Sequence, residues 1–446
     1  MNLIKWLRSG INIKRWIAAG VLGIACISFG LSYLVGNYYW DKTRALLSFF
    51  LIIAGCIFIV FAVKYIVNIV INEISASKGF RISLDSERLS NLLYEKRILI
   101  NGPKIVAIGG GTGLSTMLRG FKTFSSNITA IVTVSDDGGG SGILRQELGM
   151  LPPGDIRNCV LALADTEPIM EKLLQYRFNE GALKGQSFGN LFLAAMDGIS
   201  DSFEEAVKKM SDVLAVTGKV LPVTLENVKL CAELDDGHIV CGETNIGNHS
   251  EGHPGRIKRV YLDPATVEPL KEALVAIKEA DVVIIGPGSL YTSIIPNLLA
   301  LGESNAIKNS KAIKIYVSNI MTQPGETEGY SVSDHIEAVE SQTYKGIFDY
   351  CIANNTDIPE NLKESYSKEN AEMVMLNAED VQKLGVKIIE DDFVSIQNNL
   401  VRHNSSKLSI AIIDLVADKV LRKDKKRSID YYYVRDKLKR MTIKKK

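Results

Sequence analysis

Glycine-rich loops that follow hydrophobic runs are the segments of this sequence best suited to chemistry. The first loop, GGGTG at 109–113, follows a strand-length run at 104–108 and precedes a run of helix length. Unhindered backbone at the start of a helix can direct its N–H groups at an anion. The loop therefore predicts a phosphate site, and a tight turn without a ligand is the alternative. Its predicted contacts are Gly110, Gly111, Thr112 and Gly113.

The glycine spacing excludes the two best-known nucleotide-binding loops. A dinucleotide-binding G-x-G-x-x-G would need glycine at position 114 or 116, where Leu114 and Thr116 stand. No Gly-Lys-Ser/Thr follows, so the P-loop pattern is absent as well. A nicotinamide-dependent dehydrogenase is therefore the least favoured function.

Two carboxylates and a second glycine cluster follow the next strand-length run, in SDDGGGSG at 135–142. Asp136 and Asp137 can hold a ribose hydroxyl or a divalent cation. The glycines after them can form a second anion-binding backbone nest, and an exposed turn is the alternative. The further contacts predicted here are Gly138, Gly139, Ser141 and Arg145.

A helix that begins after PPG at 152–154 carries a cation in an unfavourable place. Asp155 can cap this helix, and Arg157 and Asn158 fall in its first turn. The helix dipole disfavours a cation at that end. We therefore expect Arg157 to have an anionic partner, either a protein carboxylate or a ligand.

The remaining candidates lie at later strand and helix ends. In SFGNL, Asn190 either caps an apolar helix or hydrogen-bonds to a base or sugar. The segment GPGS at 286–289 is, like the first loop, a glycine-rich turn between a strand-length run and a helix-length run. Two glycine loops at strand ends suit a ligand with two polar ends. The predicted contacts in this group are Gly189, Asn190, Gly286, Pro287, Gly288, Ser289, Asn319, Thr322 and Arg402.

Alternating strand-like and helix-like runs over 104–420 must position these loops. This rhythm predicts an α/β domain with a doubly wound, mostly parallel sheet, whose ligands bind at the carboxyl ends of the strands. A more β-rich insert is expected at about 215–262, with a hairpin turn at Asp236-Gly237.

The first 72 residues predict a membrane hairpin. Residues 16–36 and 45–63 contain no charged side chain, and each run is long enough to cross a hydrocarbon core. The basic residues outside the two spans place the N-terminus and the soluble domain in the cytoplasm. A signal peptide is the alternative for the first span, and residues 73–103 are expected to form a linker.

The chain ends in a basic segment, 421–446, which is expected to be a separate solvated tail. Contact with an anionic membrane is the alternative role. The net charge of +1 and the absence of a nucleic-acid motif argue against a nucleic-acid partner. The six cysteines show no metal-binding spacing, which favours a reduced cytosolic domain.

Several long motifs together resemble the CofD-like superfamily, and most closely its bacterial gluconeogenesis-factor (YvcK) branch. They are IVAIGGGTGLSTMLRGFKTF, ITAIVTVSDDGGGSG, PPGDIRN, SFGNL, GKVLPVT, ADVVIIGPGSLYTSIIPNLL, MTQPGETEGYSVSDH and VRHN, in that order. The resemblance covers about residues 100–420. It does not cover the hairpin or the basic tail.

The resemblance implies a Rossmann-like α/β domain that binds UDP-N-acetylglucosamine or a related nucleotide-sugar. It implies a regulator that supports cell-wall precursor supply and cell shape on gluconeogenic carbon sources. Thr112 and Gly113 would meet phosphate, Asn190 would help to fix the ligand, and Arg402 would reach the diphosphate or sugar. The pocket would further be lined by Asp136, Asp137, Gly288 and Ser289.

The sequence departs from the branch pattern at three positions. Gly140 stands in place of a serine and Ile143 in place of an arginine, which removes a hydroxyl donor and a cation. Gln186 stands where a histidine is expected. These changes bear on ligand affinity, ligand identity and any acid–base role at Gln186.

Two functions share this predicted pocket. The favoured one is a membrane-tethered nucleotide-sugar sensor that needs no cofactor and acts on a protein partner, such as a cell-wall precursor enzyme. The alternative is a transferase of the 2-phospho-L-lactate transferase type, in which Asp136, Asp137 and Mg²⁺ would stabilise the transferred group. No dedicated nucleophile is evident, and the sequence leaves room for a homodimer.

Overall fold

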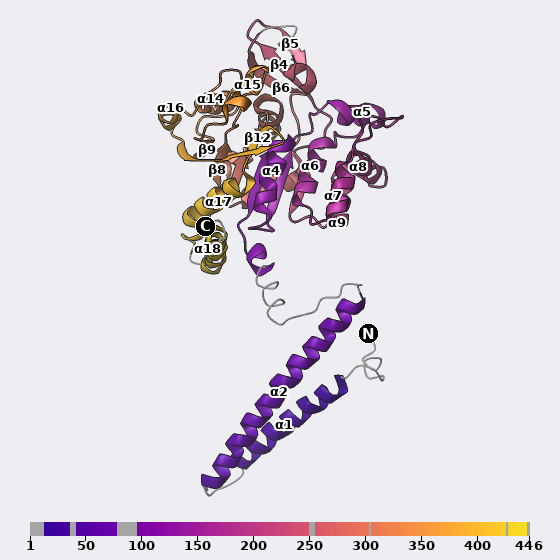
Figure 1. Ribbon diagram of the computed structural model, residues 1–446, viewed down its shortest axis with the longest axis vertical. Helices are drawn as coiled ribbons and strands as arrows, with labels where there is room; N and C mark the ends of the chain where they lie inside the picture. Colours follow the sequence, from indigo (N-terminus) through magenta and orange to yellow (C-terminus); the bar gives the residue numbers. More distant parts are fainter. Residues whose placement is uncertain are drawn as a thin grey trace. The chain divides into compact units, whose positions relative to one another are not determined.

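The computed structural model describes residues 13–35, 42–77, 96–248, 255–302, 305–424 and 427–443 (Figure 1). The chain divides into two compact units, Met1–Tyr94 and Glu95–Lys446. The first unit contains two long helices, and the second is an α/β domain.

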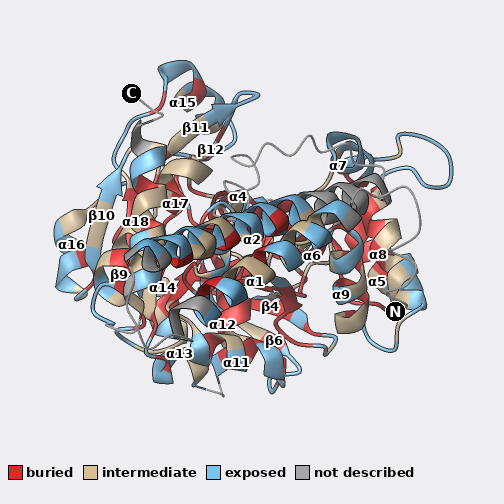
Figure 2. Cartoon of the chain, turned by 90° about the horizontal axis from the view of Figure 1, so that it is seen from below, coloured by how far each residue is buried: buried red, intermediate tan, exposed pale blue. Residues whose placement is uncertain are grey.

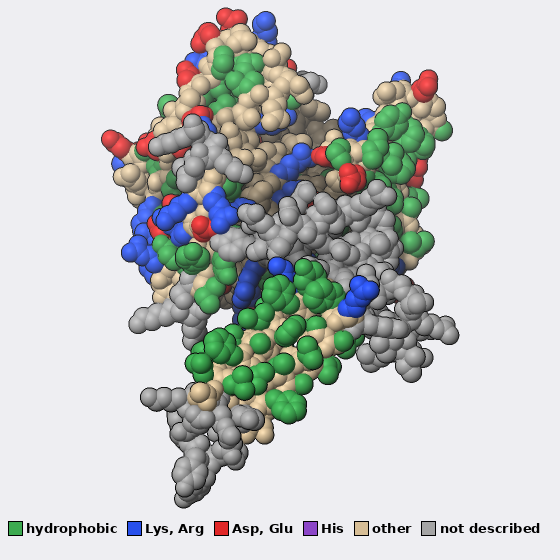
Figure 3. All heavy atoms as spheres, turned by 60° about the horizontal axis from the view of Figure 1, so that its bottom comes forward, with side chains coloured by type: hydrophobic (Ala, Val, Ile, Leu, Met, Phe, Trp, Pro, Cys, Tyr) green, Lys and Arg blue, Asp and Glu red, His purple; other side chains and the backbone are tan. Residues whose placement is uncertain are grey.

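The two helices of the first unit are long and apolar enough to cross a membrane. α1 (Ile13–Val35) contains an apolar stretch at Arg15–Ser32, and α2 (Lys42–Ser77) contains one at Leu46–Val67. A hydrocarbon core needs about 20 apolar residues in a helix. Hydrophobic side chains cover the helix surface that is visible in Figure 3.

α2 continues beyond the boundaries expected from the sequence. The predicted span ended at 63 and the predicted linker began at 73, but the helix runs on to Ser77. No glycine or proline interrupts residues 64–77, so nothing in the local sequence ends the helix earlier. Residues 78–95 of the predicted linker lie outside the described residues.

Glycines allow α1 and α2 to pack closely. A Cβ atom at Gly23 would lie 2.8 Å from the carbonyl oxygen of Gly55, and one at Gly55 would lie 2.6 Å from that of Gly23. The rings of Trp16 and Tyr65 stack with their centroids 3.9 Å apart. Small residues that let helix backbones approach closely are the typical means of helix association in membranes.

The second unit is built on a seven-stranded parallel sheet with the order β10-β9-β8-β7-β1-β2-β3. On the central strand β1, Ile105 pairs with Ile128 of β2 and with Val282 of β7. β1 and β7 are buried along their whole length, as expected for strands covered on both faces. The strands are β1 (Ile105–Gly109), β2 (Ile128–Val132), β3 (Lys219–Pro222), β7 (Val282–Ile285), β8 (Ile313–Val317), β9 (Tyr350–Asn354) and β10 (Lys387–Asp391).

Helices cover both faces of the sheet, which confirms the predicted doubly wound α/β class (Figure 2). One layer contains α4 (Gly111–Phe121), α6 (Gly154–Leu163) and α17 (Ser405–Val416). The other contains α11 (Lys271–Glu279), α12 (Ile295–Gly302) and α14 (Val332–Gln342). Smaller helices are α5 (Gly139–Leu148), α7 (Pro168–Gln175), α8 (Phe188–Gly198), α9 (Phe203–Val213), α10 (Glu243–Gly247), α13 (Ala306–Asn309), α15 (Glu360–Ser367) and α16 (Ala378–Lys383).

The predicted β-rich insert is smaller than its expected range of 215–262. β3 belongs to the main sheet, where it pairs in parallel with β2, because its buried residues continue the central core. The separate antiparallel sheet consists of β5, β4 and β6, and it stands at the top of the domain in Figure 1. Its strands are β4 (Lys229–Leu234), β5 (Ile239–Cys241) and β6 (Ile257–Asp263).

A disulfide joins β4 and β5, contrary to the expectation of fully reduced cysteines. Cys231 and Cys241 are paired residues in this antiparallel hairpin, and their sulfur atoms are bonded. The strand register places the two cysteines opposite each other. The spacing of cysteines along the sequence does not reveal this register.

The C-terminal segment is a docked helix and not the separate tail expected from its charge. In α18 (Ser428–Ile443), Val434 and Leu438 are spaced four residues apart and are buried against the domain. Arg427 forms an ion pair with Asp281, which precedes β7. Residues 425–426 and 444–446 of the predicted tail lie outside the described residues.

The glycine contact between α1 and α2 gives a first prediction. Gly55→Ala should separate the helices, because the added Cβ meets the Gly23 backbone, whereas Gly20→Ala should be tolerated, since its Cβ would lie 3.5 Å from that of Ala62. The measurement is the yield of an oxidative cross-link between cysteines introduced at positions 16 and 65, whose rings stack in the structure, in a full chain with Cys26 and Cys56 replaced by serine. An unchanged yield in Gly55→Ala would contradict the proposed packing.

Candidate functional site

The strand order brings two glycine loops together at the carboxyl edge of the sheet. β1 lies between β2 and β7. From β1 the chain continues to β2 on one side, and it later returns to form β7 on the other side of β1. Such a switch point opens a crevice between the loops that follow the two strands. Here the loops are 110–113 after β1 and 286–289 after β7, both of which the sequence predicted as anion-binding.

The two loops pack backbone against backbone. A Cβ atom at Gly113 would lie 2.6 Å from the carbonyl oxygen of Pro287, and one at Gly288 would lie 3.3 Å from that of Gly110. Gly111 has a φ of +65°, a conformation that favours glycine. Larger residues would force the loops apart.

α4 begins within the first loop. The first backbone N–H groups of a helix have no intrahelical partner, and the N-cap residue, Gly110, has no side chain to provide one. Asp155 accepts from the first of these groups, the Gly111 N–H. Thr112 and Gly113, in its first turn, both line a cavity. The helix start is therefore placed to receive an anion.

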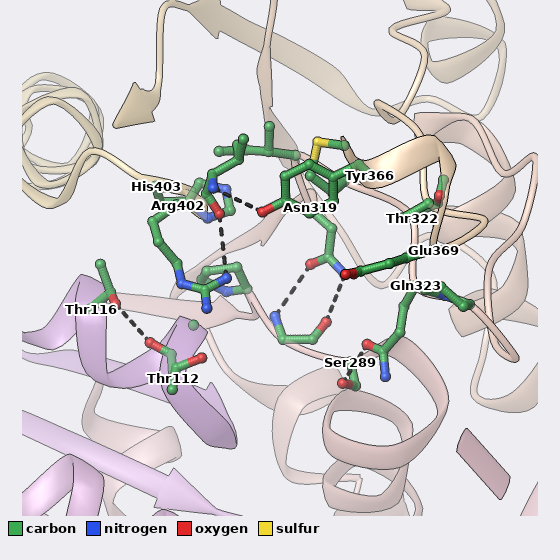
Figure 4. A pocket seen from close by; sticks show the side chains of 18 residues that line it. Thr112, Thr116, Ser289, Asn319, Thr322, Gln323, Tyr366, Glu369, Arg402 and His403 are labelled. Carbon is green, nitrogen blue, oxygen red and sulfur yellow. Dashed lines mark hydrogen bonds between the residues drawn. The ribbon is translucent and has the colours of Figure 1, made fainter. Parts of the chain in front are cut away.

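The first cavity measures about 280 Å³ and lies between the two loops and the end of β12 (Leu400–His403) (Figure 4). Amides, hydroxyls and backbone make up most of its polar lining, and Glu369 and Arg402 are its charged side chains apart from the titratable His403. This lining suits a neutral polar group, such as a base or a sugar, more than a second phosphate.

Hydrogen bonds from the cavity wall hold the second loop in place. Asn319 donates from Nδ2 to the Gly288 carbonyl (3.0 Å) and accepts from its N–H at Oδ1 (3.3 Å). Ser289 Oγ donates to Gln323 Oε1 (2.6 Å), as Figure 4 shows. The predicted contact Asn319 thus uses its amide to fix the loop.

Glu326 supports this wall and was not among the residues predicted from the sequence. It is fully buried and accepts hydrogen bonds from Gln323 Nε2 (2.6 Å), the Tyr291 N–H and the Thr292 hydroxyl (both 3.1 Å). Burial raises the pKa of Glu326 to about 7. One feature of the sequence could have identified Glu326 as a site residue: it is an acidic residue within the hydroxyl-rich segment that follows β8.

Arg402 and His403 enter from a two-stranded antiparallel sheet, β11 (Val394–Gln397) and β12. Within the described residues, the Arg402 guanidinium donates one hydrogen bond, to the Val401 carbonyl (3.3 Å), and it lies near Thr112 and Thr116 in Figure 4. His403 was not predicted as a site residue. Its Nε2 hydrogen-bonds to the Ser318 carbonyl (3.0 Å), and burial lowers its pKa to about 4, so the ring is neutral at pH 7.

A second cavity of about 680 Å³ adjoins the first. Thr112, Thr116, Arg402 and His403 line both cavities and mark their junction. The second cavity is further lined by Arg119, Arg157, Asn158 and Arg177.

Arg157 has no direct carboxylate partner within the described ranges. It donates to Ser187 Oγ (3.2 Å) and Asn158 Oδ1 (2.8 Å). The ligand contact, which is the other partner expected from the position of Arg157 in the helix, stays a prediction.

The predicted carboxylates lie behind the first loop and do not line either cavity. Asp155 does not cap α6; instead it accepts a hydrogen bond from the Gly111 N–H. Asp136 accepts from the Gly138 N–H (2.8 Å), and Asp137 accepts from the Thr244 N–H and hydroxyl (both 3.0 Å). In the part of the chain that the structure describes, no three His, Cys, Asp or Glu side chains are placed to hold a metal ion.

Burial and the charges of neighbouring carboxylates raise the pKa values of two acidic side chains here, Asp155 and Glu243. Burial is the largest cause of the raised pKa of Asp155, about 6, and the Asp136 charge adds to it. Glu243, also missed from the sequence, is buried against the same carboxylates, which raises its pKa well above the usual value.

The other predicted residues mostly serve the scaffold. Arg145 donates to Asn227 and to the Val228 carbonyl, which ties α5 to the segment before β4. Ser187, not Asn190, caps α8, and the buried Asn190 Oδ1 has no partner. Thr322 pairs with the Glu372 backbone at the edge of the first cavity. Outside the cavity linings lie Gly110, Gly111, Gly138, Gly139, Ser141, Gly189 and Gly286.

This combination defines a Rossmann-like α/β protein with a two-chambered polar cleft at its switch point. The model of the family described as 2-phospho-L-lactate transferase CofD matches residues 105–394. The chain therefore belongs to the CofD family, as the motif resemblance predicted.

Named relatives and a solved structure agree with this assignment. The chain is 52% identical to a protein of Clostridium acetobutylicum named "Putative gluconeogenesis factor", over 98% of this chain and 97% of that one. It is 47% identical to the "Gluconeogenesis factor" of Bacillus subtilis, over 71% of this chain and 99% of that one. A crystal structure of a UPF0052-family protein from Bacillus halodurans has a TM-score of 0.67 and 50% identity, and it covers 69% of this chain and 98% of its own.

The buried acid behind the first loop gives a second prediction. The folded-state pKa of Asp155 is raised from 3.8 to about 6, so its stabilising proton is lost as the pH rises through that range. Asp155→Asn should therefore stabilise the protein at pH 7.5, on the order of 2 kcal/mol, and give no gain at pH 4. Thermal unfolding of the full chain in detergent measures this, with the exposed Asp165→Asn as control. Equal shifts at both pH values would contradict it.

Proposed function

We propose that this protein is a membrane-anchored regulator that binds a nucleotide-sugar, with UDP-N-acetylglucosamine as the reference ligand. The observation that carries the proposal is the start of α4 and Arg402 at the junction of two polar cavities. A helix start and a guanidinium together provide the N–H donors and the positive charge that a diphosphate requires. The neutral first cavity suits the base and ribose.

A regulatory role is supported by four side chains of the domain, of which His403 is the one that lines the cleft. His335 and His403 each hydrogen-bond to a backbone carbonyl and not to a hydroxyl or thiol. Cys159 and Cys351 are buried, and burial raises the pKa of each thiol. These groups provide no activated nucleophile. The names of the relatives agree with a role in gluconeogenic growth, which we extend to cell-wall precursor supply and cell shape.

A transferase of the CofD type is the second candidate, because the matched family bears that enzyme's description and because acids gather behind the first loop. As they stand, Asp136 and Asp137 hydrogen-bond to different backbone segments. We propose that ligand binding requires no metal ion.

Membrane attachment is the remaining part of the proposal. α1 and α2 would cross the cytoplasmic membrane as a hairpin, with the N-terminus and the α/β domain in the cytoplasm. A protein partner in cell-wall precursor synthesis would then be met at raised local concentration.

Calorimetric titration of the full chain in detergent tests the ligand. UDP-N-acetylglucosamine should bind better than NAD or GDP, equally with EDTA or Mg²⁺, and without turnover. Arg402→Ala should weaken binding at least tenfold, the cost of one charge-assisted hydrogen bond. Arg259→Ala, on the separate β5-β4-β6 sheet, is the matched control. Preference for a guanine nucleotide with Mg²⁺-dependent turnover would replace the regulator with the transferase.

Cell fractionation tests the anchor. The full chain should sediment with membranes and resist alkaline carbonate extraction, because two apolar helices hold it. A chain that starts at residue 78 should be released. Release of the full chain by carbonate would contradict the hairpin insertion.

A further inference from the structure

The second cavity has a charge pattern that a neutral sugar does not explain. Four arginines line it, namely Arg119, Arg157, Arg177 and Arg402, and no aspartate or glutamate does. In the first cavity, Arg402 is balanced by Glu369. The positive charge of the cleft therefore gathers on one side of the junction.

The position of Arg157 shows that part of this charge lies inside the domain and not only on a solvated surface. Arg157 is 9% exposed, and within the described residues its buried Nε has no hydrogen-bond partner. Burial lowers the pKa of Arg157, the charge of the nearby Arg177 lowers it further, and the charge of Asp155 partly offsets both. Arg177 is exposed, so the buried guanidinium of Arg157 beside it is the group that calls for an anion, because buried charges are normally paired.

The charges that face Arg157 from neighbouring elements do not supply this anion. Asp155, on the same helix, favours protonated Arg157 through its charge, but it accepts its hydrogen bond from the Gly111 N–H and forms no ion pair with Arg157 in the described segments. Glu171 of α7 pairs with Arg119 at 3.4 Å. Arg177 donates to the Gly185 carbonyl and has no carboxylate within salt-bridge distance in the described segments.

We propose that the second cavity is an anion site that recognises a carboxylate or phosphate next to the bound diphosphate. This rests on the proposed function, which places the diphosphate at the junction. The anion is either carried on the sugar of an acidic nucleotide-sugar or supplied by a separate small molecule. In both cases it sits between Arg157 and Arg177, and the planar guanidinium groups can each bind it through two N–H donors.

The test compares UDP-glucuronate with UDP-glucose, which differ by one carboxylate on the sugar. Calorimetry on the full chain in detergent should show UDP-glucuronate binding about tenfold more tightly. In Arg177→Gln this ratio should fall towards one, while the affinity for UDP-glucose stays the same. Arg177 is exposed and lines only the second cavity, so the variant should fold; Arg259→Gln is the control.

A second arm titrates inorganic phosphate into the protein saturated with UDP-glucose. Arg177-dependent phosphate binding with no preference between the sugars assigns the site to a separate anion. Equal sugar affinities together with no phosphate binding would overturn the proposal, as would a preference that persists in Arg177→Gln. Failure of both UDP-sugars to bind would overturn the proposed function instead. Phosphate binding to the nucleotide-free protein, lost in Arg177→Gln, would then still support the anion site.

Discussion

The contact between the two glycine loops is the constraint on which the cleft depends. β1 and β7 are neighbours in the sheet, so their loops leave the same edge side by side, and the absence of side chains at Gly113 and Gly288 lets them touch. Asn319 bonds to one loop, and Asn297 Nδ2 donates to the Gly109 carbonyl at the base of the other (2.9 Å). This fixed contact sets where the start of α4 points and where Arg402 can reach.

The cleft separates charges of opposite sign across the first loop. The arginines line the second cavity, while Asp155 and Glu243 lie behind the loop, away from both cavity linings. Carboxylates on the ligand-facing side would repel a diphosphate. Buried behind the glycines, Asp155 accepts a hydrogen bond from the Gly111 N–H, and burial raises the pKa values of Asp155 and Glu243. An anionic ligand in the second cavity would therefore meet the arginine side chains and not these carboxylates.

The matches with relatives differ in how much of this chain they cover. The Bacillus subtilis protein matches 71% of this chain over nearly its whole length, whereas the Clostridium acetobutylicum protein matches 98% of it. The latter match therefore includes the two apolar helices. At the other end, α18 is held by apolar packing and by the Arg427–Asp281 pair, which makes it part of the domain.

The sequence by itself determined the features that depend on short segments. The glycine loops, the alternation of strands and helices and the two apolar runs can be recognised because backbone freedom, side-chain period and span length are local properties. The tertiary structure decided the rest: that β3 joins the main sheet, that Cys231 meets Cys241, that Asp155 accepts from Gly111, and that Arg157 and Arg177 converge. Each of these depends on which distant segments lie side by side. Chain spacing does not encode that, because strand register and helix docking are set by how the whole core packs.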